Sequence, residues 1–328
     1  MKTIVYERFG PPEVLRFDEV ETPTPKEREI LIRVRAAVVS ATDSAFRAGR
    51  PLLARLAAGA RKPRLPTLGD ALAGDVVAAG GAVTRFRIGD RVFGASGPRL
   101  GAHAEYIALG EDAAIAKLPD GISYAEAAGI ADGGLTALPF LRDKAGVRAG
   151  QKVLVNGAAG AIGTIAVQLA KHYGAHVTGV AGAANAELVR SLGADEVIDY
   201  AREDFTLRRE AFDIVFDAVG KSSFAEARRA LRRGGLYLTT VPTPRAMAGM
   251  LWPSVLGGKR AIFAATGLRK PADKANDLSF MAGLIEAGLL KVVIDESFPF
   301  EAFAAAHARV DTGHKKGVVV LAMERAAA

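Results

Sequence analysis

The stretch that decides the fold is Val153-Leu154-Val155-Asn156-Gly157-Ala158-Ala159-Gly160-Ala161-Ile162-Gly163. Its apolar start predicts a buried strand, its glycine-rich middle a tight turn, and the helical spacing of apolar residues up to Leu169 a helix that ends at Gly174. Residues 176–180 supply a second strand within the expected unit of about 30 residues. Such a turn brings backbone N–H groups close to a pyrophosphate, so the sequence predicts a dinucleotide site.

The turn departs from the strict glycine pattern at one position, where this chain has Ala158. Two glycines of the pattern are still present. Gly160 leaves room beside the pyrophosphate, and Gly163 leaves room where the helix crosses the strand. The residues that we expect around the pyrophosphate are Gly157, Ala159, Gly160, Ala161, Ile162 and Gly163.

Length and composition exclude several classes of protein. A chain of 328 residues exceeds one ordinary core, which predicts two domains. No apolar run approaches the roughly 20 residues that span a bilayer, and residues 1–6 predict a strand rather than a targeting segment, so we expect a cytoplasmic protein with no membrane association. Cysteine is absent, which excludes disulfides, thiolate nucleophiles and cysteine-ligated zinc.

The basic charge does not by itself indicate a nucleic-acid partner. The net charge is +7 and the pI about 9.6, but the basic residues are spread in short groups without a long block or interleaved aromatic residues. Attraction of a phosphate-bearing cofactor and ordinary solvation are the better explanations, and nucleic acid is an unlikely partner. The five histidines lack the spacing of metal ligands.

The predicted secondary structure of the chain changes near residue 124. Before it, strand-like runs alternate with Gly and Pro turns; after it, strands and helices alternate as in a doubly wound parallel sheet. Early strands are predicted at 3–6, 30–39, 74–79 and 104–108, and later helices at 187–192, 224–232, 277–287 and 300–309. Residues 291–294 and 318–322 are predicted as extended segments of the tail. Residues 51–60 and 246–253 could cover a pocket for a flat organic substrate or serve ordinary packing or a subunit contact.

Several short motifs, spread over the whole chain, resemble the medium-chain dehydrogenase/reductases and, within them, the zinc-independent quinone oxidoreductase-like branch. Besides the glycine turn they are residues 68–74, 89–94, 101–106, 134–137, 191–200 and 216–220. The resemblance implies an α/β fold in which a Rossmann domain with a doubly wound parallel sheet, residues 125–265, is inserted in a GroES-like, β-rich catalytic domain, residues 1–124 and 266–328. It also suggests a homodimer formed along the edge of the nucleotide-domain sheet.

The resemblance puts the three zinc-ligand positions of the alcohol dehydrogenase relatives at Ser40, Asp70 and Asp132. A hydroxyl and two carboxylates are hard oxygen ligands, unsuited to a tight tetrahedral zinc site, so we expect no catalytic metal. Without a Lewis acid an unactivated alcohol is hard to oxidise. A quinone or an α,β-unsaturated carbonyl accepts hydride from a nicotinamide more readily.

Candidate catalytic residues follow from these positions. Ser40 and Thr42 could hydrogen-bond the nicotinamide ribose or the substrate oxygen, or be buried turn hydroxyls. Asp70 and Asp132, if close together, could share a proton so that one acts as a general acid near neutral pH, or be solvated loop acids. By resemblance, Thr136 lies near the nicotinamide ring.

The residues after the second strand favour NADPH over NADH. An acid that grips the adenosine ribose is expected about 20 residues past the turn, but the chain reads Ala181-Gly182-Ala183-Ala184-Asn185 there. Contacts to the 2′-phosphate must then come from Asn185, Arg190, Tyr200, Lys315 or Lys316. The other expected cofactor contacts are Ala181, Gly182, Ala218 and Val219.

The sequence thus predicts an NADPH-dependent, zinc-independent reductase of quinones or enones. Two alternatives stay open. An alcohol or aldehyde dehydrogenase would require a bound metal. A non-catalytic nucleotide-binding sensor or RNA-associated protein would bind the cofactor without turnover.

Overall fold

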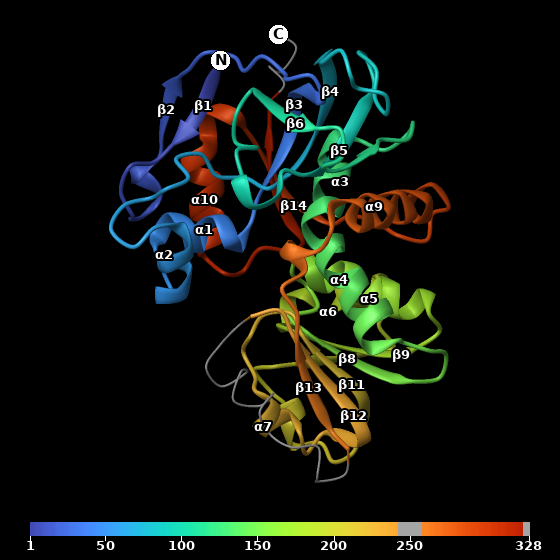
Figure 1. Ribbon diagram of the computed structural model, residues 1–328. Helices are drawn as coiled ribbons and strands as arrows, with labels where there is room; N and C mark the ends of the chain where they lie inside the picture. Colours follow the sequence, from blue (N-terminus) through green and yellow to red (C-terminus); the bar gives the residue numbers. More distant parts are fainter. Residues whose placement is uncertain (242–257, 324–328) are drawn as a thin grey trace. The chain divides into compact units, whose positions relative to one another are not determined.

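A computed structural model describes residues 1–241 and 258–323 of the chain. Its internal contacts divide it into two compact units (Figure 1). Unit 1 comprises Met1–Asp132, Leu268–Glu286 and Val293–Ala328, and unit 2 comprises Gly133–Gly267 and Ala287–Val292. The predicted fold class is confirmed, because unit 2 contains a parallel sheet with crossover helices and unit 1 a larger, mostly antiparallel sheet.

Unit 2 is built on a six-stranded parallel sheet in the order β10-β9-β8-β11-β12-β13. Its strands are β8 (Lys152–Asn156), β9 (His176–Ala181), β10 (Glu196–Asp199), β11 (Phe212–Asp217), β12 (Leu231–Thr239) and β13 (Arg260–Phe263). Its helices in the described part of the chain are α4 (Leu135–Pro139), α5 (Ala161–His172), α6 (Ala186–Ser191) and α7 (Phe224–Ala227), with shorter turns η4 (Phe140–Ala145), η5 (Ala183–Asn185) and η6 (Phe205–Leu207). The strand order reverses at β8, which has β9 on one side and β11 on the other, so ligands are expected at the carboxyl ends of these strands.

Unit 1 is built on a seven-stranded sheet in the order β14-β15-β3-β4-β5-β7, with β6 paired to β3. The strands are β3 (Glu29–Val39), β4 (Ala71–Ala79), β5 (Arg91–Ala95), β6 (Tyr106–Gly110), β7 (Ala114–Lys117), β14 (Ile294–Pro299) and β15 (Val318–Ala322). A separate antiparallel pair is formed by β1 (Lys2–Val5) and β2 (Arg16–Glu19). Because β15 pairs with β3, the end of the chain completes a sheet that its first part begins.

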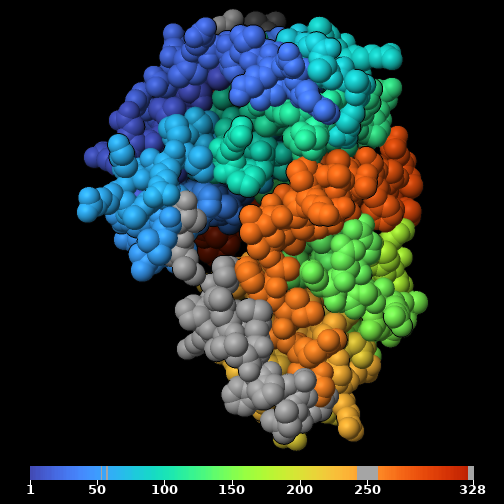
Figure 2. Space-filling model, viewed as in Figure 1, coloured from blue at the N-terminus to red at the C-terminus, as the bar shows by residue number. Residues whose placement is uncertain are grey.

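Five helices of the described residues belong to unit 1. They are α1 (Ala41–Ala48), α2 (Leu52–Ala58), α3 (Tyr124–Gly129), α9 (Pro271–Glu286) and α10 (Phe303–Asp311), with shorter turns η1 (Pro12–Val14), η2 (Gly97–Arg99) and η8 (Phe300–Ala302). The turns η3 (Ile130–Gly134) and η7 (Thr266–Leu268) include the chain positions where the two units divide. Figure 2 shows α2, in light blue, at the surface, where Leu52 is 70% and Leu56 54% exposed.

Some predicted elements were wrong in extent. The helix predicted at 224–232 ends at Ala227, because Ala230 and Leu231 are buried where the chain enters β12 and Leu231 pairs with Phe212 of β11. The tail strand predicted at 291–294 instead begins at Ile294, where pairing with β15 starts. The helix predicted at 277–287 begins earlier, at Pro271, a residue well suited to a first helical position. The cover predicted at 246–253 lies outside the described residues.

Candidate functional site

The glycine turn between β8 and α5 has two positions where only glycine fits. Gly157 has φ +81°, and a Cβ atom there would lie 2.3 Å from Val219 Cγ1. A Cβ atom at Gly163 would lie 2.1 Å from the Gly157 carbonyl oxygen, so the crossing of helix and strand depends on this glycine. The departure from the strict pattern at Ala158 is tolerated: its side chain is buried, and its amide donates to the Val180 carbonyl at 3.0 Å.

Gly160 differs from these two glycines. A Cβ atom there would meet only the Gly157 oxygen, at an ordinary distance of 3.5 Å, so packing within the protein does not require glycine. Gly160 is the N-cap of α5, and no side chain caps this helix among the described residues. The space above Gly160 and the N–H groups of the first turn are therefore suited to an anionic ligand, and a pyrophosphate fits this cradle.

A buried carboxylate shapes the neighbouring turn at the end of β11. Asp217 is fully buried, and both of its oxygens accept hydrogen bonds at distances of 2.9–3.2 Å. The donors are the Asn156 amide, the backbone N–H groups of Val219, Gly220 and Ser222, and the hydroxyls of Ser222 and Tyr237. The turn holds Ala218 and Val219 at the carboxyl edge of the sheet. Sequence reasoning missed this role of Asp217, although its place at a strand end was a usable signal.

The segment after β9 holds an acceptor without a partner. The side-chain oxygen Oδ1 of Asn185 is buried and makes no hydrogen bond within the described part of the chain. Tyr200, which follows β10, is 62% exposed, and its hydroxyl would lie 3.1 Å from a Cβ atom at Gly182. Arg190, on α6, is exposed. Because buried acceptors rarely stay unpaired, Asn185 fits a ligand that donates a hydrogen bond.

Unit 2 thus brings most of the predicted cofactor residues to one edge of its sheet. Ala181 ends β9, and the glycine turn, Gly182, Asn185, Tyr200, Ala218 and Val219 follow the carboxyl ends of β8, β9, β10 and β11. Thr136, on α4, lies in the same unit, with its hydroxyl 3.4 Å from that of Thr266. Lys315 and Lys316 belong to unit 1, so unit 2 alone does not bring them to this group.

Ser40 and Asp43 cap α1 together. The Ser40 hydroxyl donates to Asp43 Oδ2 at 2.6 Å and accepts from the Asp43 amide at 3.1 Å. Asp43 Oδ1 accepts from the Gly69 amide at 2.9 Å, which ties α1 to the loop that carries Asp70. Asp43 was not among the predicted residues, although serine followed three positions later by an acid is a recognisable cap pattern.

Ser40 and Thr42 offer different chemistry to a ligand. The proton of the Ser40 hydroxyl is used on Asp43, so this oxygen could only accept a further hydrogen bond. Thr42 is exposed on the first turn of α1, and its hydroxyl makes no hydrogen bond within residues 1–241 and 258–323. Thr42 can therefore donate as well as accept.

Asp70 and Asp132 are half-buried acids whose charges interact. Burial raises the pKa of Asp70, although its Oδ1 accepts from the Gly97 amide at 2.7 Å. Burial also raises the pKa of Asp132 to about 6, an effect opposed by the charge of Lys315 and reinforced by those of Asp43 and Asp70. No hydrogen bond joins Asp70 to Asp132 among the described residues. Both acids are therefore partly shielded from solvent, and Asp132 titrates near neutral pH.

Lys315 and Lys316 lie in the turn before β15. Burial lowers the pKa of Lys315, whose ammonium donates to the Gly317 carbonyl at 2.6 Å and is attracted by Asp132 and Asp295. Lys316 is exposed, and its amide donates to Asp295 Oδ1 at 2.9 Å. The Lys315 ammonium is thus a counter-charge to the Asp132 carboxylate within unit 1.

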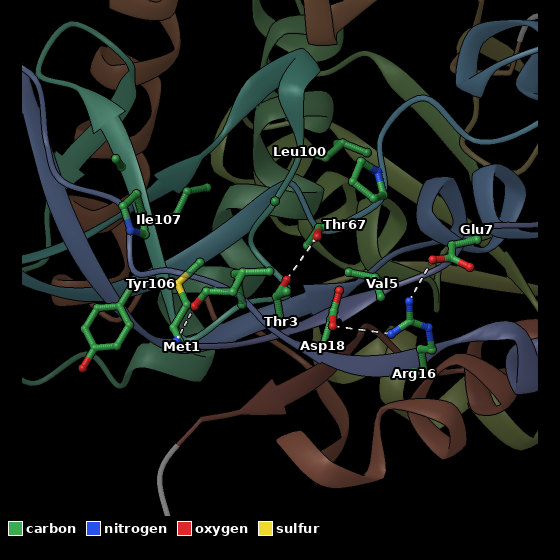
Figure 3. A pocket seen from close by; sticks show the side chains of 16 residues that line it. Met1, Thr3, Val5, Glu7, Arg16, Asp18, Thr67, Leu100, Tyr106 and Ile107 are labelled. Atoms are coloured by element: carbon green, nitrogen blue, oxygen red, sulfur yellow. Dashed lines mark hydrogen bonds and ion pairs between the residues drawn. The ribbon is translucent and has the colours of Figure 1, made fainter.

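A separate pocket of about 410 Å³ lies beside the β1–β2 pair (Figure 3). The Thr3 and Thr67 hydroxyls meet at 3.1 Å in its wall, and Arg16 pairs with Glu7 and Asp18. None of the predicted site residues lines this pocket. Across the described residues no cluster of three or more histidine or acidic side chains is arranged to hold a metal ion, and no helix is long and apolar enough to cross a membrane.

Comparison with known proteins gives matches over the whole chain. The alcohol dehydrogenase GroES-like domain family matches residues 26–139, and the zinc-binding dehydrogenase family matches residues 192–321. A quinone oxidoreductase of Pseudomonas aeruginosa is 33% identical over 98% of this chain and 99% of its own length. An NADPH-dependent alkenal/one oxidoreductase of Arabidopsis thaliana chloroplasts is 34% identical over 98% of this chain and 79% of its own. The structure of the Escherichia coli quinone oxidoreductase complexed with NADPH is 27% identical, with a TM-score of 0.86 over 98% of this chain and 100% of that one.

Proposed function

The chain belongs to the medium-chain dehydrogenase/reductase superfamily, in its zinc-independent quinone oxidoreductase-like branch, and on this basis we propose that it reduces quinones or α,β-unsaturated carbonyl compounds with NADPH. The observation that carries the proposal is the α5 N-terminus. Packing within the protein does not require glycine at position 160, so the space that Gly160 leaves open there is available to a ligand. The relatives named as quinone and alkenal/one oxidoreductases support the same reaction class.

The residues of unit 2 bind and orient the dinucleotide in this proposal. The turn from Gly157 to Gly163 receives the pyrophosphate, and the N–H groups of the first α5 turn supply the partial positive charge. Ala218 and Val219 border the same edge, and Thr136 lies toward the nicotinamide. When bound, NADPH supplies hydride.

NADPH rather than NADH is the finer part of the proposal. No acid stands between Ala181 and Asn185 to repel a 2′-phosphate. Tyr200 can donate its phenolic proton to such a phosphate, and Arg190 supplies positive charge on the same unit. Lys315 is a weaker candidate, because its ammonium is attracted by Asp132 and Asp295.

Unit 1 supplies the proton in this proposal. A pKa of about 6 means that a useful fraction of Asp132 is protonated near neutral pH, as a general acid requires. The Lys315 ammonium stabilises the carboxylate left after proton transfer, and Asp70 raises its proton affinity. Thr42 is the donor available to a substrate oxygen or the ribose, and Ser40 an acceptor for a ribose hydroxyl.

We assign the catalytic domain to residues 1–124 and 266–328 and the nucleotide domain to residues 125–265. The homodimer is proposed to form along an edge of the unit 2 sheet, whose described edge strands are β10 and β13. The cytoplasmic location stays a prediction.

The test is NADPH oxidation, followed optically with metal-free protein against a panel of quinones and enones, with NADH as control. Turnover that survives chelation and prefers NADPH supports the proposal. Activity on alcohols that depends on added metal would contradict it. Tight NADPH binding without turnover on any acceptor would favour a sensor instead.

A further inference from the structure

Four polar side chains from four segments of unit 1 are buried together. They are Tyr6, which follows β1, Arg47 of α1, His103, which precedes β6, and His307 of α10, and each is at most 1% exposed. In Figure 1 α10 (red) lies beside α1 (blue), and contacts between these two helices agree with that view. We refer to these four residues as the buried polar cluster. It lies among the apolar side chains that pack β1 against α10.

The buried polar cluster contains atoms without hydrogen-bond partners in the described part of the chain. They are the Tyr6 hydroxyl, Arg47 Nε, His103 Nδ1 and both ring nitrogens of His307. Native proteins pair nearly all buried polar atoms with protein groups or ordered water. Several unpaired atoms in one region therefore indicate a shared partner.

The members of the cluster are connected through contacts and through the action of charges. The rings of His103 and His307 meet edge to face with their centroids 5.6 Å apart. The His103 ring packs on Gly69, where a Cβ atom would lie 2.5 Å from His103 Cδ2, and the Gly69 amide donates to Asp43. The Asp43 charge acts on Tyr6 and that of Arg47 on His307.

The unpaired atoms include both donors and acceptors. His103 Nε2 lies 3.0 Å from the Val38 carbonyl oxygen, which can only accept, so Nε2 carries a proton, and in the neutral ring Nδ1 is an acceptor. Burial beside His103 and Arg47 holds the pKa of His307 well below its usual value, so this ring is neutral, with one donor and one acceptor. Arg47 Nε–H is a donor. Nη1 and Nη2 of the same side chain donate to the Gly10 carbonyl and to Asp311, whereas Nε has no partner among the described residues.

The presence of both donors and acceptors in the cluster determines which kind of ligand it can bind. A cation would meet the guanidinium of Arg47 and the N–H of His307, whereas an anion would meet the lone pair of His103 and the nearby carboxylate of Asp43. Water both donates and accepts. We propose that the buried polar cluster binds ordered water, which donates to His103 Nδ1 and one His307 nitrogen and accepts from Arg47 Nε and the Tyr6 hydroxyl.

The water would link α10 to the last turn of α1. His307 is on α10, Arg47 is on α1, and Asp43 adjoins both His103, through Gly69, and Tyr6. The water would therefore join α10 and the last turn of α1 to the segments that carry Tyr6 and His103. This inference does not depend on the proposed reaction.

The decisive measurement is a crystal structure of the full chain at atomic resolution, with an anomalous data set to identify any heavier ion. We expect solvent density within about 2.7–3.2 Å of at least two of the unpaired atoms. Side chains bonded directly to one another, an empty space or an anomalous peak would each overturn the proposal.

Variants give a second test in solution. Tyr6→Phe and His307→Leu each remove groups that bind the water, so the loss of Tm in the double variant should be clearly smaller than the sum of the single losses. His307→Gln keeps a donor and an acceptor and should lose less than His307→Leu. Tyr106→Phe, a half-buried control outside the cluster, should combine additively with His307→Leu. Additive losses for Tyr6→Phe with His307→Leu would count against shared water.

Discussion

The Ser40 hydroxyl donates to Asp43 Oδ2 at 2.6 Å while the Asp43 amide donates back to the same hydroxyl at 3.1 Å. The second carboxylate oxygen of Asp43 binds the Gly69 amide at 2.9 Å. One buried acid therefore caps α1 and fixes the loop that carries Asp70. Ser40 and Asp70, both candidate catalytic residues, depend on it for their placement.

Asp43→Asn should destabilise the protein although it keeps the size of the side chain. The amide supplies one acceptor where the carboxylate supplies two, so either the cap or the Gly69 contact is lost, at about 1–3 kcal/mol. Thermal unfolding should show Tm lower by roughly 2–10 °C. Glu126→Gln is the matched control, because Glu126 is the capping-box acid of the exposed start of α3. A loss for Asp43→Asn no larger than that for Glu126→Gln would contradict this role.

Gly160→Ala and Gly163→Ala should separate ligand binding from folding. At Gly163 the new methyl group would meet the Gly157 carbonyl at 2.1 Å, an overpacking that costs about 1–3 kcal/mol. At Gly160 it meets no protein atom closer than 3.5 Å, so the stability should change by no more than about 1 kcal/mol, while NADPH binding weakens.

The measurements for this pair are Tm of the free protein and the Kd of NADPH by fluorescence titration. Gly160→Val is expected to weaken binding further than Gly160→Ala, because it fills more of the space. Unchanged NADPH affinity in Gly160→Val would contradict the proposal that the pyrophosphate binds at this turn.

The glycine turn could be predicted from sequence because its signals are local. A strand, a turn and a helix lie within a few residues, and Gly157 and Gly163 are required by contacts inside that unit. The helix predicted at 224–232 failed for the opposite reason. Buried residues such as Ala230 and Leu231 have the same apolar character in a helix and at the start of a strand, and pairing with β11 decides between them.

The candidate site was predictable only in part. Sequence motifs indicated Asp70 and Asp132 but not that burial raises their pKa values, because the segments that bury them and the charges that act on them, such as Asp43 and the opposing Lys315, are distant in the sequence. Asp43 had a visible cap spacing, whereas its bond to Gly69 is a tertiary contact. The pairing of His103 with His307 had no signal in the sequence.

His307 should make the protein less stable in mild acid. Its pKa in the folded protein lies well below the ordinary value of about 6.5, so below that pH the unfolded chain binds a proton that the folded chain does not. The stability is fully present above about pH 6.5 and declines as the pH falls. His307→Gln cannot take up this proton.

The check is Tm as a function of pH for the unaltered protein and for His307→Gln. The difference between the two curves isolates this residue, and it should shrink as the pH falls below about 6.5. His314→Gln, at an exposed position, is the control and should leave the curve unchanged. A difference that is independent of pH would rule out the buried neutral state of His307.

Asp132→Asn should change both the pH profile of turnover and the pH dependence of stability. With a pKa of about 6, the protonated form of Asp132 disappears as the pH rises through 6, and turnover of an enone should fall with it. Asparagine cannot donate this proton, so the variant should lose about 10²-fold or more in kcat at pH 5–6 and lose that limb of the profile, with KM for NADPH unchanged.

Because the folded pKa is raised, the stabilisation from protonated Asp132 is present in acid and lost as the pH rises through 6. Asp132→Asn should therefore have the higher Tm at pH 8, whereas Asp273→Asn, at an exposed position, should change neither profile. Unchanged turnover combined with the expected gain in Tm would leave Asp132 as a buried acid without a catalytic role.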